Sequence, residues 1–252
     1  MRFCSVGKTP AIAGRVTPGI VRNYNFDMAI KAPVFPADTT ELASPSQTAL
    51  IARRMLDSRA DLRAKAERTG APGEPCQHNR LARECFHSIV QCRKPIIAAI
   101  NGPALGAGLS VAASCDILVA ANSASVRLPE INVGLLGGGR HAMRLFGHSK
   151  TRQMMLTGLR LDGAELYRLG VVEDCVPVSD LMDVAMALAK EIAAKSPPAV
   201  VIAKHALNAI EDMSLRDGYR FEQTMTVEVG RTEDAAEATR SFLEKREPNW
   251  KE

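Results

Sequence analysis

The pattern of apolar positions is clearest in the middle of the chain, where helix-like and strand-like segments alternate. Between Glu74 and Cys92 the apolar residues recur at the spacing of one helix face, namely at Leu81, Cys85, Phe86, Ile89 and Val90. The uninterrupted apolar run Ile96–Ile100 is typical of a buried strand, and Asp116–Ala121 predicts a second one. The small-residue segment Leu105–Ser114 between them is predicted to be a helix. This alternation predicts a layered α/β fold whose strands are covered on both faces.

The two ends of the chain show different patterns. From Ser179 onward only helix periodicity remains, in segments 179–195, 197–213, 215–230 and 232–246, with Ser179 and Thr232 as predicted N-caps. Residues 1–56 carry five prolines and no sustained period, and only Thr48–Leu56 has the pattern of a helix. We therefore divide the chain into an N-terminal segment 1–56, a mixed core 57–178 and a helical region 179–252.

Composition and charge narrow the class of protein. Aromatic residues make up only 4% of the chain, which suits layered helices and sheet better than a β-sandwich. No apolar run is as long as a bilayer-spanning helix and the N-terminus lacks a secretory signal, so we expect a soluble cytoplasmic protein with no membrane partner. The net charge of +4 arises in residues 1–65, which hold ten Lys/Arg and five Asp/Glu without interleaved aromatics. Nucleic-acid binding is therefore not expected.

The six cysteines do not indicate a metal site or a disulfide framework. None forms a C-x-x-C pair, and none has a histidine at zinc-ligand spacing. We expect them to be reduced and mostly buried, as small apolar side chains are.

Candidate chemistry is concentrated between Lys94 and Gly147. A predicted strand ends there in Asn101-Gly102-Pro103, and a helix begins within Ala104–Gly108. Small residues at a helix N-terminus let a ligand approach free backbone N–H groups. The Gly-Lys-Ser/Thr ending of a P-loop is missing, and no dinucleotide fingerprint fits. From these residues alone, a ligand site and a small-residue helix packed closely on a sheet both remain open.

The same stretch resembles the crotonase family, also called the enoyl-CoA hydratase/isomerase superfamily. The resemblance is close over Lys94–Asp116 and Leu128–Gly139. It continues through Met155–Gly158, the predicted strand Gly170–Val172 and Thr232–Trp250, and so covers roughly residues 58–252. It implies a crotonase-like ββα spiral core with a helical C-terminal region that assembles into a homotrimer or homohexamer. It also implies an acyl-CoA thioester as substrate, with coenzyme A as part of that substrate and no separate cofactor.

The resemblance also assigns roles to individual residues. It implies that the backbone N–H groups of Ala60 and Ala107 form an oxyanion hole, in which each donor contributes about 3–4 kcal/mol in other enzymes. Glu130 corresponds to one of the family's two acid/base glutamates, and Gly138 to a backbone amide near the reacting water. The family's other glutamate falls at Ser110. The remaining residues that the resemblance places around the substrate are Asp61, Leu62, Gly106, Ser110, Leu135 and Lys245.

Departures from the family pattern leave two functions open. A serine at position 110 has no useful basicity near neutral pH, so a single carboxylate favours double-bond isomerisation over hydration. The main prediction is an enzyme of the enoyl-CoA hydratase/isomerase type with Glu130 as acid/base. The alternative is a non-catalytic crotonase-fold protein that binds acyl-CoA or assembles with active relatives, which Arg59 in place of a family glycine also favours. Residues 1–56 show none of the family's N-terminal patterns, either through an altered reading frame or through a replacement segment.

Overall fold

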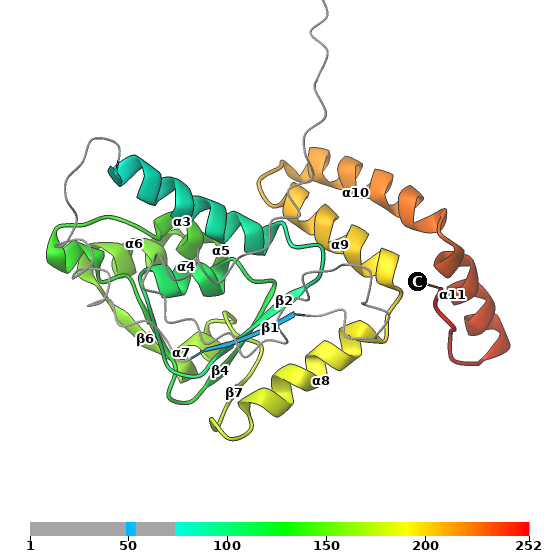
Figure 1. The fold of residues 1–252 in the computed structure, drawn as a ribbon, viewed down its shortest axis with the longest axis horizontal. Coiled ribbons are helices and arrows are strands. Elements are labelled where there is room, and N and C mark those ends of the chain that lie inside the picture. Colours follow the sequence, from blue (N-terminus) through cyan, green and yellow to red (C-terminus); the bar gives the residue numbers. More distant parts are fainter. Residues whose placement is uncertain (1–48, 54–73, 252) are drawn as a thin grey trace, which may run out of the picture.

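The main sheet of the computed structural model consists of parallel strands flanked by helices (Figure 1). The structure describes residues 49–53 and 74–251. Four strands pair in the order β1-β2-β4-β7, with bounds Ala49–Arg53, Ile96–Ile100, Ile117–Ala121 and Cys175–Val176. All three pairings are parallel. The predicted buried strands at Ile96–Ile100 and 116–121 are therefore confirmed, the second beginning one residue later.

Alternate residues of β2 pack against different layers. Ile97 and Ala99 lie in one apolar cluster with Leu181 and Ala185 of helix α8 (Leu181–Ala193). Ile96, Ala98 and Ile100 lie in the other cluster, which contains residues of the helix α4 (Ala107–Ala113). A strand with both faces covered consists of continuous apolar residues, which is why this segment shows no alternation with polar ones.

The part of the chain from Glu74 to Arg168 also contains a smaller sheet and six helical elements, among them α4. Strands β3 (Pro103–Leu105) and β5 (Ser125–Arg127) are parallel, and β6 (Arg160–Asp162) runs antiparallel to β5. The helical elements are α3 (Glu74–Val90), η1 (Glu130–Val133), α5 (Gly139–Leu145), α6 (His148–Thr157), α7 (Gly163–Arg168) and α4 itself. Helix α3 was predicted over Glu74–Cys92 and ends two residues earlier.

The C-terminal region is helical from Leu181, as the periodicity predicted. Helices α9 (Pro197–Ile210), α10 (Leu215–Gly230) and α11 (Glu233–Glu244) follow α8, and α11 lies farthest from the sheet (Figure 1). Thr232 caps α11 as predicted, because its hydroxyl accepts the N–H of Ala235. Ser179 does not cap α8. The N-cap position is Asp180, and the Ser179 hydroxyl donates to the Asp180 carboxylate instead.

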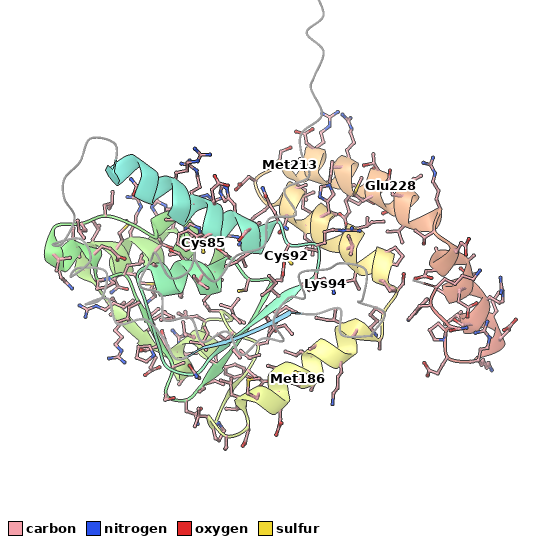
Figure 2. The ribbon with its side chains drawn as sticks, viewed as in Figure 1. Cys85, Cys92, Lys94, Met186, Met213 and Glu228 are labelled. Carbon is pink, nitrogen blue, oxygen red and sulfur yellow. The ribbon has the colours of Figure 1, made fainter. Side chains whose placement is uncertain are left out.

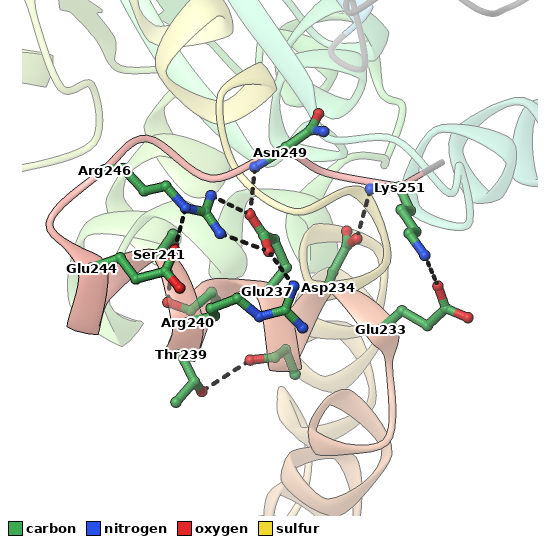
Figure 3. Close-up of polar contacts among 12 residues, drawn as sticks. Glu233, Asp234, Glu237, Thr239, Arg240, Ser241, Glu244, Arg246, Asn249 and Lys251 are labelled. Carbon is green, nitrogen blue, oxygen red and sulfur yellow. Dashed lines mark hydrogen bonds and ion pairs between the residues drawn. The ribbon is translucent and has the colours of Figure 1, made fainter.

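Residues 245–251 fold back along α11 through a polar network (Figure 3). Arg246 pairs with Glu237, whose carboxylate also accepts the N–H of Asn249, and these bonds lower the pKa of Glu237 to about 2. The buried Asp234 accepts the N–H of Lys251 and the hydroxyl of Ser196. These contacts tie the end of the chain both to α11 and to the start of α9.

Besides the Ser179 N-cap, two predicted secondary-structure segments are wrong. Thr48–Leu56 was predicted as a helix, whereas Ala49–Arg53 is the strand β1, paired in register with β2. The apolar run is too short to show a period, and its backbone groups are satisfied by pairing with β2. Gly170–Val172 was expected as a strand but forms a bend after Gly170, whose φ is +69°, and β7 begins at Cys175. Across the described ranges, none of the helices has the length and apolar character needed to cross a membrane.

Candidate active site

The register of β3 and β5 brings Gly106 beside the chain that leads to Glu130. Leu105 is paired with Arg127, and the N–H of Gly106 donates to the Arg127 carbonyl at 2.9 Å. Glu130 begins η1 three residues later, and a methyl group on Gly106 would overlap its Oε1 atom. Gly106 has φ +54° and ψ −114°, a backbone conformation that L side chains rarely adopt. Glycine at 106 therefore allows both the turn and the close approach of the carboxylate.

Ser110 of α4 and Gly138, the N-cap of α5, lie next to each other. Ser110 is one turn into the helix, where its N–H donates to the Gly106 carbonyl, and it is only 2% exposed. A methyl group on Gly138, which has φ +75°, would lie 3.3 Å from Ser110 Oγ and 2.7 Å from a methyl carbon of Leu128. The Gly138 position thus tolerates no side chain without movement of its neighbours.

We call Gly106, Ala107, Ser110, Glu130 and Gly138 the α4 cluster. They are the sequence-predicted residues that the structure brings together. Ala107 is the first residue of α4, and N–H groups in the first turn of a helix have no acceptor within that helix. The cluster therefore combines a carboxylate, a hydroxyl and backbone donors at one helix end, which suits stabilisation of an oxygen that gains negative charge beside a group that moves a proton.

Of the other predicted site residues, Leu135 adjoins Glu130, while the rest lie elsewhere or outside the described residues. Ala60, Asp61 and Leu62 fall outside the described residues. Leu135 touches Glu130 through the backbone, because its N–H donates to the Glu130 carbonyl at 2.9 Å. Lys245 is the exposed C-cap of α11, at the opposite end of the molecule from α4 (Figure 1). A single chain does not bring Lys245 to the α4 cluster.

The nearby histidine and the cysteines do not supply further reactive groups. The His141 ring packs edge-on against Phe86 at 4.8 Å between centroids, and burial together with Arg144 and other cations lowers its pKa. Burial raises the pKa of Cys115 to about 12, which makes this thiol unreactive. Cys85 and Cys92 are free thiols at separate positions along α3 and just beyond it (Figure 2). The part of the chain that the structure describes contains no group of three or more potential metal ligands.

One contact near the cluster was not anticipated from sequence. Arg144 of α5 donates to the carbonyl of Ala113, the last residue of α4, and to the carboxylate of Glu211 after α9. The signal in the sequence is weak, a pair of arginines at positions 140 and 144 on one helix. Only the fold reveals that a distant acidic pair, Glu211 and Asp212, lies opposite them.

Comparison with known proteins identifies the family of the chain. A family model described as Enoyl-CoA hydratase/isomerase matches residues 59–252. The chain belongs to this family. A probable mitochondrial enoyl-CoA hydratase of Dictyostelium discoideum is 40% identical over 179 residues, which cover 70% of this chain and 65% of that protein. A probable enoyl-CoA hydratase of Rhizobium meliloti is 36% identical over 169 residues, 66% of each chain. The chain thus matches just under two thirds of the length of these relatives.

Solved structures of family members confirm the fold class. The enoyl-CoA hydratase of Bacillus anthracis superposes with a TM-score of 0.73 at 27% identity, covering 81% of this chain and 95% of that one. The human enoyl-CoA hydratase domain-containing protein 3 superposes with a TM-score of 0.71 at 29% identity, over 75% and 76% of the two chains. The predicted α/β crotonase fold with C-terminal helices is therefore correct.

Proposed function

We propose that the chain binds an acyl-CoA thioester and moves a proton on its acyl chain, with Glu130 as acid/base and the N–H of Ala107 as an oxyanion donor. The observation that carries the proposal is the contact of the Glu130 carboxylate with Gly106, the residue immediately before Ala107. A thioester oxygen held at the Ala107 N–H brings the α-carbon within range of a carboxylate on that side. The second donor remains the predicted Ala60 N–H.

The chemistry that suits one carboxylate is isomerisation of a 3-enoyl to a 2-enoyl thioester. Glu130 takes a proton from C2, the electron pair of that C–H bond moves toward the carbonyl, and negative charge collects on the thioester oxygen. The oxyanion donors stabilise this charge. The protonated Glu130 then returns the proton to C4, and the double bond moves from C3–C4 to C2–C3. No other reactant is consumed.

Hydration of a 2-enoyl thioester makes a greater demand on the site. Water must lose a proton as its oxygen bonds to C3, while C2 gains one. The position that corresponds to the family's other glutamate is held by the buried Ser110, whose hydroxyl does not act as a base without an activating group. We therefore expect hydration to be slower than isomerisation.

Glu130→Gln tests the catalytic role directly. Gain of the conjugated-thioester absorbance from a 3-enoyl-CoA reports isomerisation, and its loss from crotonyl-CoA reports hydration. The substitution should lower kcat for isomerisation by about 100-fold or more, because general acid–base catalysis contributes typically 10²–10⁴-fold. The dissociation constant for a saturated acyl-CoA should change by less than about threefold. Wild-type protein that binds acyl-CoA without turning over either substrate would instead favour the non-catalytic alternative.

Ser110→Glu tests the position of the second carboxylate. A buried carboxyl near Glu130 raises one pKa of the pair, the arrangement that acid/base hydration requires. Hydration should increase relative to isomerisation, while Ser110→Ala, which removes only the hydroxyl, should leave their ratio unchanged. An unchanged hydration rate in a folded Ser110→Glu variant that still binds acyl-CoA would show that residue 110 does not face the reacting atoms.

Self-association into a trimer or hexamer is the second part of the proposal. Large apolar side chains are exposed in the C-terminal region, including Met186 of α8 and Met213 between α9 and α10 (Figure 2), as well as Leu207, Phe242 and Leu243. Surfaces of this kind are usually covered by a partner. A monomer mass by light scattering at micromolar concentration would contradict the proposal. A role for Lys245 in substrate binding depends on such a neighbour. The cytoplasmic location stays a prediction, since two relatives are named as mitochondrial.

A further inference from the structure

Arg144 joins three elements through one guanidinium group. Its Nη1 donates to the carbonyl of Ala113 at 2.6 Å, and its Nε lies 2.8 and 3.1 Å from the two carboxylate oxygens of Glu211. Ala113 ends α4, Arg144 is in the last turn of α5, and Glu211 directly follows α9. The side chains of Arg144 and Glu211 are only 20% and 32% exposed.

The hydrogen bond from Arg144 to the Ala113 carbonyl provides a donor for one of the carbonyl groups at the end of α4. The last carbonyls of a helix have no N–H partner within it, and a cation there also interacts favourably with the helix dipole. A charged donor makes this a strong hydrogen bond, and Glu211 neutralises the partly buried charge. The ion pair of Arg140 and Asp212 also joins α5 to the residues after α9, but it differs from that of Arg144 in its exposure and in its lack of a helix-end bond in the described part of the chain. Its side chains are 58% and 78% exposed, and within the described residues Arg140 donates to no helix-end carbonyl.

The contacts of Arg144 act on α4 and α5, which together with their N-caps carry every residue of the α4 cluster except Glu130. Helices α4 and α5 have seven residues each, so the ends that Arg144 holds are less than two turns from the cluster. Ser110 is on α4 and Gly138 is the N-cap of α5, and the space between them does not admit a methyl group without strain. A small tilt of α4 against α5 would therefore change the spacing between Ala107, Ser110 and Gly138.

We propose that Arg144, held by Glu211, is a positioning residue for the reaction at the α4 cluster. It fixes α4 against α5 and links both to the end of α9, so that the C-terminal helices support the geometry of the site without touching the substrate. This inference rests on the proposed function, and its test includes a measurement that does not depend on activity.

The experiment compares R144M with R140M, which removes the neighbouring exposed arginine from the same helix. Hydrogen exchange of the segment 106–114 reports the mobility of α4, and kcat and KM for a 3-enoyl-CoA report the site. R144M should speed exchange in this segment at least tenfold and lower kcat at least tenfold, with KM changed less than threefold. R140M should change each quantity less than twofold. R144K, which keeps the charge, should recover part of kcat, and E211Q should lie between R144M and wild type.

Several outcomes would overturn the proposal. Exchange in segment 106–114 that is equal in R144M and R140M would show that Arg144 does not hold α4. A kcat that stays at the wild-type value despite faster exchange would show that the contacts of Arg144 do not position the reacting groups. If R144M fails to fold, R144K and E211Q carry the same comparison. A wild-type protein without turnover refutes the proposed function, and the exchange comparison then decides the role of Arg144 in holding α4.

Discussion

Gly106→Ala is the most informative single change, because two independent penalties meet at this position. The new methyl group would overlap Oε1 of Glu130, so either the carboxylate or the backbone must move. The backbone itself, at φ +54° and ψ −114°, disfavours an L side chain. We therefore expect loss of stability together with loss of turnover, since displacing Glu130 removes the acid/base group from the cluster.

The expected loss of stability can be divided between the two penalties. A side chain in a sparsely populated backbone region costs about 1–3 kcal/mol. Overpacking in a tightly packed site costs about 1–3 kcal/mol more. Gly134→Ala is the matched control, because Gly134 also has a positive φ, +67°, but nothing lies within 4 Å of the added methyl group. We expect it to lose only about 1–2 kcal/mol, the backbone part.

The assay is urea unfolding of four proteins, wild type, Gly106→Ala, Glu130→Ala and the double variant, with turnover of a 3-enoyl-CoA measured in parallel. Removal of the Glu130 carboxylate relieves the overlap but leaves the backbone penalty. Gly106→Ala should therefore cost about 1–3 kcal/mol less in the Glu130→Ala background than in wild type.

The reasoning would be refuted if the stability losses of Gly106→Ala and Glu130→Ala were additive in the double variant. If the two substitutions add to within about 0.5 kcal/mol, residues 106 and 130 do not interact in solution. A Gly106→Ala variant that retains wild-type kcat would likewise show that Glu130 does not act from its place beside Gly106. The Gly134→Ala control should keep its turnover under both outcomes.

Two further predictions concern stability outside the α4 cluster. Lys204 is 6% exposed and donates to the Asp116 carboxylate at 2.7 Å. Because Lys204→Met leaves this carboxylate without its cation, it should lower the free energy of unfolding, measured in urea, by about 2–4 kcal/mol. A loss below about 1 kcal/mol would contradict this prediction. Arg246 holds the pKa of Glu237 at about 2, below its ordinary 4.5, so this carboxylate stabilises the fold above pH 4.5 and loses that effect as the pH falls toward 2. Trp250, the single tryptophan, donates to the Ala194 carbonyl, and its fluorescence emission should shift to the red as the pH falls from 4.5 toward 2. Glu237→Gln should show the red shift already at neutral pH. Emission that stays constant would exclude a link between the Glu237 charge and the position of Trp250.

Much of this protein was determined by local sequence. The periodicity predicted α3, the four C-terminal helices and the strands β2 and β4 within a few residues, because an apolar face or an apolar run records how each segment is buried. The motif around Gly106 and the Leu128-Pro129-Glu130 segment identified the family and most of the α4 cluster. Positions with special backbone angles, such as Gly106 and Gly138, also carry their own signal in a glycine.

Tertiary structure alone decided three other features. The run at Ala49–Arg53 is a strand because β2 offers a partner in register, which its own five residues cannot show. Arg144 reaches both Ala113 and Glu211, two residues that lie 31 and 67 positions away in sequence. Lys245 was grouped with the substrate site but lies on α11, away from α4 (Figure 1). In the first two cases the deciding contact joins residues that are distant in the chain, and in the third the fold keeps distant residues apart. Local propensity carries no information about which distant residues the fold brings close.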